Sequence, residues 1–319
     1  MGTFGRTVRD ATYTLDAIYG IDPRDNYTLA QGRNTPSGGY AQFLANRTSL
    51  KGATFGLPWK SFWVYADAEQ QAVLVSILEL IQSAGATIVN ESEILDYETL
   101  VSDAGCNWDW GTTRGRSNES EYTVVAVDFY NNIKSYLAEL DNTNIRTLED
   151  IVNFNHENDG SEGGYPYPNG GGIPAFASGQ DGFLASLATE GIRNETYLQA
   201  LSFCQGKTRE GIDWALKGGD QDIPDGKARL DGLLVPPDVG QTYQIAAQAG
   251  YPMITVPAGT HSQDGMPSGL AIMQTAWAED ELVRWASAIE DLQQATDGWA
   301  YKRTLPEWRS YLQRNIPVL

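Results

Sequence analysis

The chain has 319 residues, of which 41% are hydrophobic and 20% charged, a composition typical of a globular protein with a large core. The formal net charge of −19 would repel a phosphate backbone, so nucleic-acid binding is not expected. No apolar run approaches the ~20 residues of a membrane span, and the first residues lack the apolar stretch of a signal peptide.

The N-terminal region predicts one helix followed by a loop. Apolar residues recur at helical spacing from Val8 to Ile18, and Gly20 ends the helix. Residues 22–49 are polar and contain Asn, Thr, Pro and Gly, so they predict a loop.

The next segment predicts a strand–helix–strand unit. Residues 50–58 contain a short strand that ends at a proline. Asp67 can cap a long apolar helix, and Gly85 lies at its C-terminal end. Residues 86–89 form the following strand. This order predicts a crossover between two parallel strands.

The middle of the chain predicts two helices separated by a long loop. The apolar spacing of residues 122–140 predicts an amphipathic helix, and residues 195–216 return to helical spacing. Residues 155–182 are rich in Gly and Pro, which predicts either a functional surface loop or a mobile one.

The last third predicts three strands and a final helix. Residues 233–235, 253–259 and 267–273 are apolar runs bounded by Pro or Gly, which is typical of buried strands. A helix is expected to end at Gly250, and residues 282–292 place their apolar side chains on one helical face. Strands alternating with helices predict the α/β class, with a mixed β-sheet flanked by helices.

The two histidines, His156 and His261, are the first candidates for catalysis. A Ser-His-Asp triad needs a histidine, but the sequence contains no Gly-x-Ser-x-Gly nucleophile motif. Two histidines with scattered carboxylates also lack the ligand spacing of a zinc site. Both histidines lie in polar segments, so solvated surface positions are expected.

Two further strings resemble sites but favour ordinary turns. Asp220, Asp222, Asp225 and Asp231 resemble a calcium loop, yet their spacing does not fit an EF-hand and its terminal Glu is missing. The string 37–39, Ser-Gly-Gly, could offer backbone N–H groups to an oxyanion. It lies in a polar loop without an adjacent strand and helix, so a turn is predicted.

The cysteines and the glycosylation sequons bear on the cellular compartment. Cys106 and Cys204 could form one disulfide or remain two buried thiols. The chain carries five Asn-x-Ser/Thr sequons where about two would arise by chance, and this excess favours either secretory passage or a polar surface rich in Asn. The candidate glycosylation sites are Asn26, Asn46, Asn90, Asn118 and Asn194.

Four sequence blocks resemble the amidase signature family, in the family's order. The resemblance spans nearly all of the chain, is more general over residues 100–225, and includes the final helix with Leu282 and Glu290. It is closest to secreted fungal members. The four blocks are residues 5–11 (GRTVRDA), 50–58 (LKGATFGLP, with the helix and Gly85 that follow), 230–236 (LDGLLVP) and 249–259 with 266–270 (AGYPMITVPAG and MPSGL).

The resemblance implies an amide hydrolase whose catalytic segment is absent. Family members use a Ser–cis-Ser–Lys triad, in which a neutral Lys accepts a proton through the bridging Ser. In the family these residues precede the arginine-containing segment that residues 5–11 of this chain resemble. No residue of this chain therefore inherits a catalytic role. Lys51 and Lys60 are not substitutes, because neither lies in the family's Lys motif.

The resemblance therefore predicts that residues 1–319 are the C-terminal portion of a single amidase domain, with an incomplete amidase-signature fold. The parent would act on a small-molecule amide without a cofactor, and this portion alone would be inactive. A non-catalytic ligand-binding pseudoenzyme is the alternative, and a hydrolase built on His156 or His261 is a third reading. Removal of neighbouring strands and helices would expose an apolar surface, so association through that surface is expected.

Overall fold

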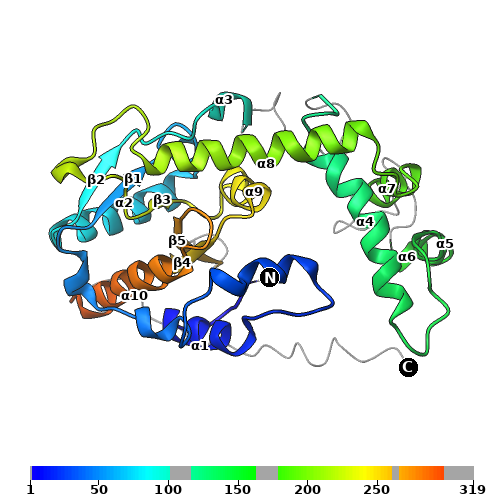
Figure 1. Cartoon of the computed structure of the whole chain (residues 1–319), viewed down its shortest axis with the longest axis horizontal. Coiled ribbons are helices and arrows are strands. Elements are labelled where there is room, and N and C mark those ends of the chain that lie inside the picture. The colour runs from blue at the N-terminus through cyan, green and yellow to red at the C-terminus, as the bar shows by residue number, and fades with distance from the viewer. Residues whose placement is uncertain (1, 101–115, 163–178, 261–265, 298–319) are drawn as a thin grey trace.

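A five-stranded mixed sheet forms the centre of the structure, which we describe from a computed structural model over residues 2–100, 116–162, 179–260 and 266–297 (Figure 1). The strand order is β2-β1-β3-β5-β4. The first three strands of this order run parallel, whereas β5 is antiparallel to both β3 and β4. The predicted mixed α/β fold is confirmed. The strands are β1 (Thr54–Leu57), β2 (Thr87–Asn90), β3 (Leu233–Val235), β4 (Met253–Thr260) and β5 (Pro267–Met273).

The predicted strand–helix–strand unit is present. Helix α2 (Ala68–Ser83) begins after Asp67, whose carboxylate accepts hydrogen bonds from the backbone N–H groups of Glu69 and Gln70. Gly85 adopts a φ of +94°, which lets the chain turn from the helix into β2. Strand β2 then pairs in parallel with β1, as the order of the elements predicts.

Four further helices pack around the sheet. Helix α10 contacts α2, β4 and β5, and α1 lies against α10, while α8 and α9 pack against each other. In Figure 1 the strands lie between α8 and α10. The helices are α1 (Val8–Ile18), α8 (Glu195–Leu216), α9 (Gly240–Ala249) and α10 (Glu279–Ala295).

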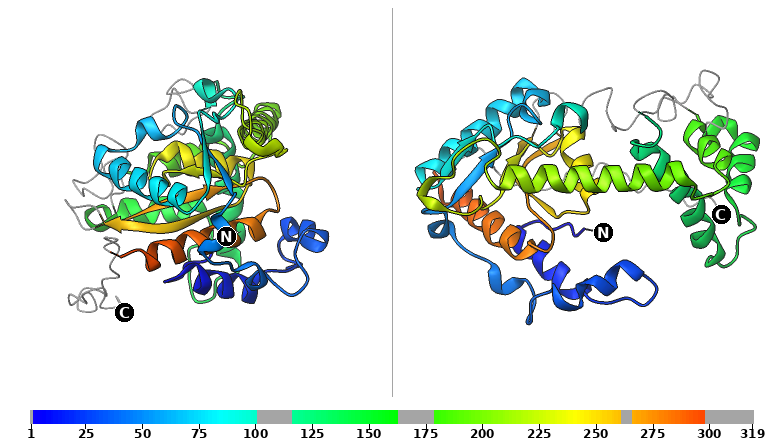
Figure 2. Two further views of the ribbon diagram at one scale, coloured as in Figure 1. Left: turned by 90° about the vertical axis from the view of Figure 1, so that its left-hand side faces the viewer. Right: turned by 45° about the horizontal axis from the view of Figure 1, so that its top comes forward.

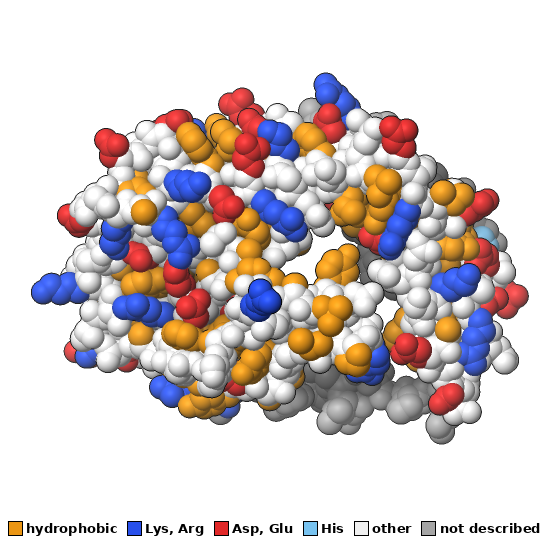
Figure 3. Space-filling view, viewed as in Figure 1, with side chains coloured by type: hydrophobic (Ala, Val, Ile, Leu, Met, Phe, Trp, Pro, Cys, Tyr) orange, Lys and Arg blue, Asp and Glu red, His pale blue; other side chains and the backbone are white. Residues whose placement is uncertain are grey.

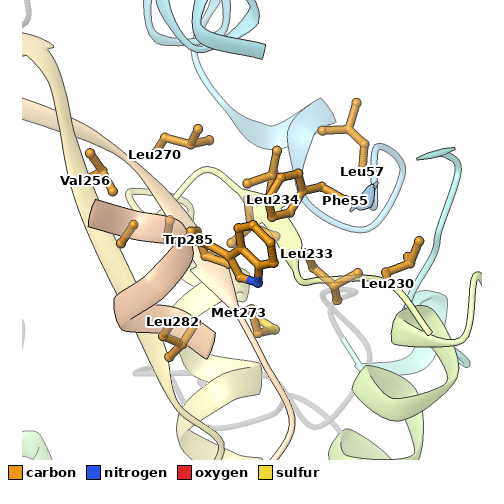
Figure 4. Packing of buried hydrophobic residues seen from close by; sticks show 14 of the residues in the cluster. Phe55, Leu57, Leu230, Leu233, Leu234, Val256, Leu270, Met273, Leu282 and Trp285 are labelled. Carbon is orange, nitrogen blue, oxygen red and sulfur yellow. The ribbon is translucent and has the colours of Figure 1, made fainter. Parts of the chain in front are cut away.

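The core lies where β1, β3 and β5 meet α10 (Figure 4). The rings of Phe55 and Trp285 pack edge to face with centroids 5.6 Å apart. Every residue of β3 is buried, and the indole Nε1 of Trp63 donates to the carbonyl of Leu234 over 3.0 Å. The expectation of missing cover is wrong for the apolar strands 233–235 and 269–273, which are buried within this chain. It is not contradicted for 253–256, because β4 lies at the edge of the sheet with Thr255 exposed and with Met253 and Ile254 half-buried.

Helix α8 extends from this body to a second group of helices, the arm (Figures 1 and 2). The predicted bounds of α8 are confirmed, and the helix predicted from residue 122 is present as α4. The predicted loop 155–182 is wrong in its described part, which holds the end of α5, all of α6 and the start of α7; residues 163–178 lie outside the described residues. The arm comprises α4 (Glu121–Ala138), α5 (Leu148–Glu157), α6 (Asp159–Glu162) and α7 (Asp181–Ala188).

The predicted loop 22–49 contains short 3-10 helices. It is held to α1 by Asp16, whose carboxylate accepts from the backbone N–H groups of Tyr40 and Ala41 at 2.5 and 3.0 Å. The string at 37–39 lies in a turn, as predicted. The remaining short elements are η1 (Asn26–Arg33), η2 (Ala41–Phe43), η3 (Arg47–Leu50), η4 (Trp63–Tyr65), α3 (Tyr97–Leu100) and η6 (Pro224–Gly226).

A membrane-spanning helix is not found among the described residues, because none of their helices is both long enough and apolar enough.

Candidate functional site

A pocket of about 340 Å³ lies where α8 meets two connections, the one from α9 to β4 and the one from β5 to α10. It combines a basic, an acidic and two aromatic side chains with small residues. Its lining residues are Arg209, Ala249, Gly250, Tyr251, Ala276, Trp277 and Glu279.

Helix α8 contributes two charged residues to this region, Arg209 and Asp213, which lie one helical turn apart on the same face. The Nε of Arg209 donates to the carbonyl of Ala249 over 2.8 Å. Asp213 accepts two hydroxyl hydrogen bonds, from Tyr251 to Oδ2 at 2.9 Å and from Thr275 to Oδ1 at 2.7 Å. One carboxylate therefore joins the two connections that form the pocket.

The sheet register explains why Asp213 reaches both hydroxyls. Met253 of β4 lies opposite Met273 of β5, and the backbone N–H of Gln274 donates to the carbonyl of Pro252 over 3.1 Å. The antiparallel ladder thus continues one step beyond the strands. The residues just beyond it, at 251 and 275, leave the sheet next to each other.

Two residues with positive φ shape the pocket walls. Gly250 ends α9 in the left-handed conformation with a φ of +68°, which glycine adopts without steric cost. Trp277 has a φ of +63°, a region that is strained for a bulky aromatic residue. Such strain costs about 1–3 kcal/mol and is concentrated at functional sites and ligand clamps. The conformation of Trp277 therefore supports a functional reading of this pocket.

Burial governs the ionisation of the pocket's acids. It raises the pKa of the Tyr251 hydroxyl, and the hydrogen bond to Asp213 acts in the same direction. Burial also raises the pKa of Glu279, the first residue of α10. One carboxylate oxygen of Glu279 is buried and has no hydrogen-bond partner among the described residues. The pocket thus holds a basic and an acidic side chain that are not paired with each other.

The structure does not support the histidine and acidic candidates as a site. His156 lies in α5 of the arm, so the expected polar loop is wrong there, and His261 lies outside the described residues. Across the described ranges, no three His, Cys, Asp or Glu side chains are placed to share a metal ion. Asp231 instead accepts hydrogen bonds from the backbone N–H of Thr54 and from Lys227.

The cysteine pairing remains untested. Cys204 is buried in α8 and its Sγ donates to the carbonyl of Glu119 over 3.3 Å. Cys106 lies outside the described residues.

Secretory passage would require the sequon asparagines to lie at the surface, and four of the five do. Asn26, Asn46, Asn90 and Asn194 are exposed, and Asn118 is half-buried. Exposure alone does not show glycan attachment, which stays a prediction for all five positions, as does secretion of the parent.

The pocket was not found from the sequence because its residues come from three separate segments. The signals that could have pointed to it are local. Arg209 and Asp213 are spaced four apart on a predicted helix, and a Tyr follows the Gly250 that ends another helix. Neither signal places the residues next to each other without the sheet register.

Sequence comparison relates the chain to amidases. No family model matches it. A protein of Schizosaccharomyces pombe that bears an amidase name is 48% identical over 319 residues, which is 99% of this chain but 52% of that protein. The chain thus spans about half the length of the curated relatives it matches.

Structure comparison also finds amidases. The native peptide amidase from Stenotrophomonas maltophilia has 26% sequence identity and a TM-score of 0.65, with 94% of this chain and 54% of that chain covered. An amidase family protein from Bacillus anthracis has a TM-score of 0.67 over 92% of this chain and 48% of its own, and at 20% identity it shows the shared fold. The chain is therefore similar in sequence to proteins that bear amidase names, and similar in fold to solved amidases.

Proposed function

We propose that the chain is the C-terminal portion of an amidase-signature hydrolase that acts on the carbon–nitrogen bonds of amides. The observation that carries this proposal is the similarity to the S. pombe protein, which runs along 99% of this chain yet covers 52% of that relative. The Ser–cis-Ser–Lys triad that the resemblance implies would lie in the part of the relatives that this chain does not span. The chain alone would then not turn over amides.

The properties of Lys60 support that assignment. A catalytic Lys base must be neutral near pH 7, which requires a lowered pKa. The hydrogen bond and charge of Glu91 instead raise the pKa of Lys60, whose Nζ lies 3.3 Å from a carboxylate oxygen of Glu91. Lys60 is also exposed, so it has the properties of a surface cation rather than of a base.

Large apolar side chains outside the sheet mark surface that a further segment could cover. They lie on residues 18–29 and on the arm, and Figure 3 shows that the molecule is hollowed between these parts. Single exposed apolar residues are ordinary, but several on facing elements favour an interaction surface. We therefore propose association through this surface, with an upstream segment or with other chains. Exposed examples are Ile18, Ile21, Tyr27 and Leu29 in the first part, Tyr136 and Phe154 in the arm, and Leu198 in α8 beside it.

A non-catalytic ligand-binding protein is the second candidate. The observation that favours it is the pocket beside α8, because its lining combines a basic, an acidic and two aromatic side chains that a ligand could contact. Such a protein would bind an amide without cleaving it.

The deciding experiment compares the chain alone with a fusion. Residues 1–319 are expressed alone and behind the part of the S. pombe relative that precedes the matched region. Turnover of aryl amides and esters and labelling by a fluorophosphonate probe are measured for both. The hydrolase proposal expects activity and one labelled serine in the fusion only. Stoichiometric serine labelling of the chain alone contradicts it, and a folded fusion that binds amides without turnover favours the binding protein.

A further inference from the structure

We propose that the pocket beside α8 binds a neutral carboxamide in preference to the corresponding carboxylate, and that Asp213 sets this preference as a positioning residue. The inference rests on the proposed function, since it names a group of the amide substrate that this chain would contact. It concerns a recognition contact away from the reacting bond.

The hydrogen-bond directions at Tyr251 carry the argument. Its hydroxyl donates to Asp213 at 2.9 Å, and an ionised carboxylate can only accept. The single phenol proton is thereby committed, so the phenol oxygen retains only acceptor capacity. Asp213 also accepts from Thr275 at 2.7 Å, which holds the carboxylate in place. The pocket therefore contains a hydroxyl oxygen that can receive an N–H but cannot donate.

Arg209 supplies hydrogen-bond donors, which complement the acceptor oxygen of Tyr251. Its Nε is used by the carbonyl of Ala249, but a guanidinium has five N–H donors. Its remaining N–H groups have no hydrogen-bond partner among the described residues. Arg209 is close enough to Tyr251 for its charge to lower the pKa of the phenol, against the larger rise caused by burial. A carboxamide offers a carbonyl to the guanidinium and an N–H to the phenol oxygen, and so it satisfies both side chains.

A carboxylate fits the same pocket less well. It has no N–H for Tyr251, and its charge would face Glu279, which has a buried carboxylate oxygen without a partner among the described residues. Two acceptors that approach without a proton repel each other, and a polar group buried without a partner loses free energy. Tyr251 and Glu279 thus both oppose the attraction of Arg209 for a carboxylate. The pocket would separate a carboxamide from the corresponding carboxylate.

Asp213 acts through Tyr251 rather than by contact with the ligand. With Asn at position 213, the side-chain amide can donate to the hydroxyls, and the phenol proton is released. Tyr251 could then donate to a carboxylate, so the preference for the amide would be lost. The bond to Thr275, two residues before Trp277, also links Asp213 to the strained aromatic residue of the wall.

The test uses residues 1–319 labelled with 5-fluorotryptophan and followed by fluorine NMR. The Trp277 resonance is assigned with Trp277→Phe, and the resonances of buried Trp63 and Trp285 report on the core. Benzamide and benzoate are titrated as matched probes. A saturable shift of Trp277 with benzamide and none with benzoate, while the core resonances stay in place, is the expected result. An equal or larger shift with benzoate, or no saturable shift with benzamide, overturns the proposal.

Variants separate the positioning role from a general effect on folding. Asp213→Asn should allow benzoate to shift Trp277, and Tyr251→Phe should abolish the benzamide response. Asp220→Asn, which removes the same charge at an exposed residue outside the pocket lining, should behave as the original chain. Unchanged selectivity in Asp213→Asn contradicts the role of Asp213. If that variant does not fold, Tyr251→Phe decides. No turnover is measured, so this result and that of the fusion experiment are independent.

Discussion

The backbone N–H of Val8 donates to Oε2 of Glu290 over 3.1 Å, although 282 residues separate them in the sequence. The bond lies at the first residue of α1, where unpaired N–H groups carry partial positive charge. Glu290 is 8% exposed and belongs to α10. A buried carboxylate of the last described helix thus holds the start of the first one, in the segment that resembles the family's arginine block.

Replacement of Glu290 should loosen α1. Glu290→Ala removes a charged acceptor and leaves a buried N–H without it, so we expect a loss of about 1–3 kcal/mol in the free energy of unfolding. Urea unfolding followed by circular dichroism measures it. Glu79→Ala, at an exposed position inside α2, is the control and should change stability by less than about 0.5 kcal/mol. Equal losses in both variants would show that the bond to Val8 contributes little.

Gly56 in β1 should not tolerate a side chain. A Cβ at this position would lie 2.6 Å from a methyl of Leu230, 2.8 Å from a methyl of Leu233 and 3.0 Å from the Cβ of Ser92. Gly56→Ala should therefore overpack the sheet and cost about 1–3 kcal/mol, measured by urea unfolding.

Gly206 in α8 provides the matched control. A Cβ there meets nothing within 4 Å. Because alanine favours a helix interior more than glycine, Gly206→Ala should stabilise the chain by up to about 1 kcal/mol. A stabilising effect of Gly56→Ala would contradict the close packing of β1 against Leu230 and Leu233.

The sequence predicted those elements whose signals are local. Helix α8 begins and ends where its helical spacing indicates. The strands of the last third were also predicted, because continuous apolar runs between Pro and Gly are typical of buried strands. Helix α5 was missed, although its Thr147 and Asp150 form a capping box that the sequence already displays.

The pocket could not be predicted because it depends on long-range placement. Asp213 meets Tyr251 and Thr275 only because β4 and β5 pair in a particular register and α8 crosses their ends. No local sequence pattern encodes this contact. The same reason explains why the expectation of an uncovered strand at 269–273 is wrong: its cover comes from α2 and α10, whose positions on the sheet are set by tertiary packing.

Glu121 should make stability depend on pH. Burial raises the pKa of this carboxyl, while hydrogen bonds from Gln244, at 2.6 Å, and Gln248 oppose the rise. At pH values below about 4.5, the ordinary pKa of a glutamate, the carboxyl of Glu121 is protonated in both the folded and the unfolded chain. As the pH rises through that value the unfolded chain ionises first, so the folded state loses stability until its own carboxyl ionises.

Glu121→Gln removes this loss, so its stabilising effect relative to the original chain should be larger at pH 7 than at pH 4. Urea unfolding at the two pH values measures the difference. Glu195→Gln is the control, because Glu195 is also the first residue of a helix and accepts from a glutamine, Gln199, but is exposed. A pH-independent effect of Glu121→Gln would show that burial does not perturb this carboxyl.

Two of the five sequon asparagines have a structural role that is independent of glycosylation. Asn46 and Asn194 are N-caps, whose side-chain oxygens accept from the backbone N–H groups of Thr48 and Tyr197, each over 3.0 Å. Asn is among the residues that N-cap positions prefer, so capping accounts for part of the excess of sequons.

Asn194→Ala should cost about 1 kcal/mol in an unglycosylated bacterial product, because α8 loses its cap. Asn90→Ala, at the exposed last residue of β2 and without a capping bond, should stay within about 0.5 kcal/mol. Urea unfolding compares the two variants. A loss at Asn90 as large as that at Asn194 would contradict the capping role, and a glycan found at Asn194 after expression through a secretory pathway would show that the position serves both purposes.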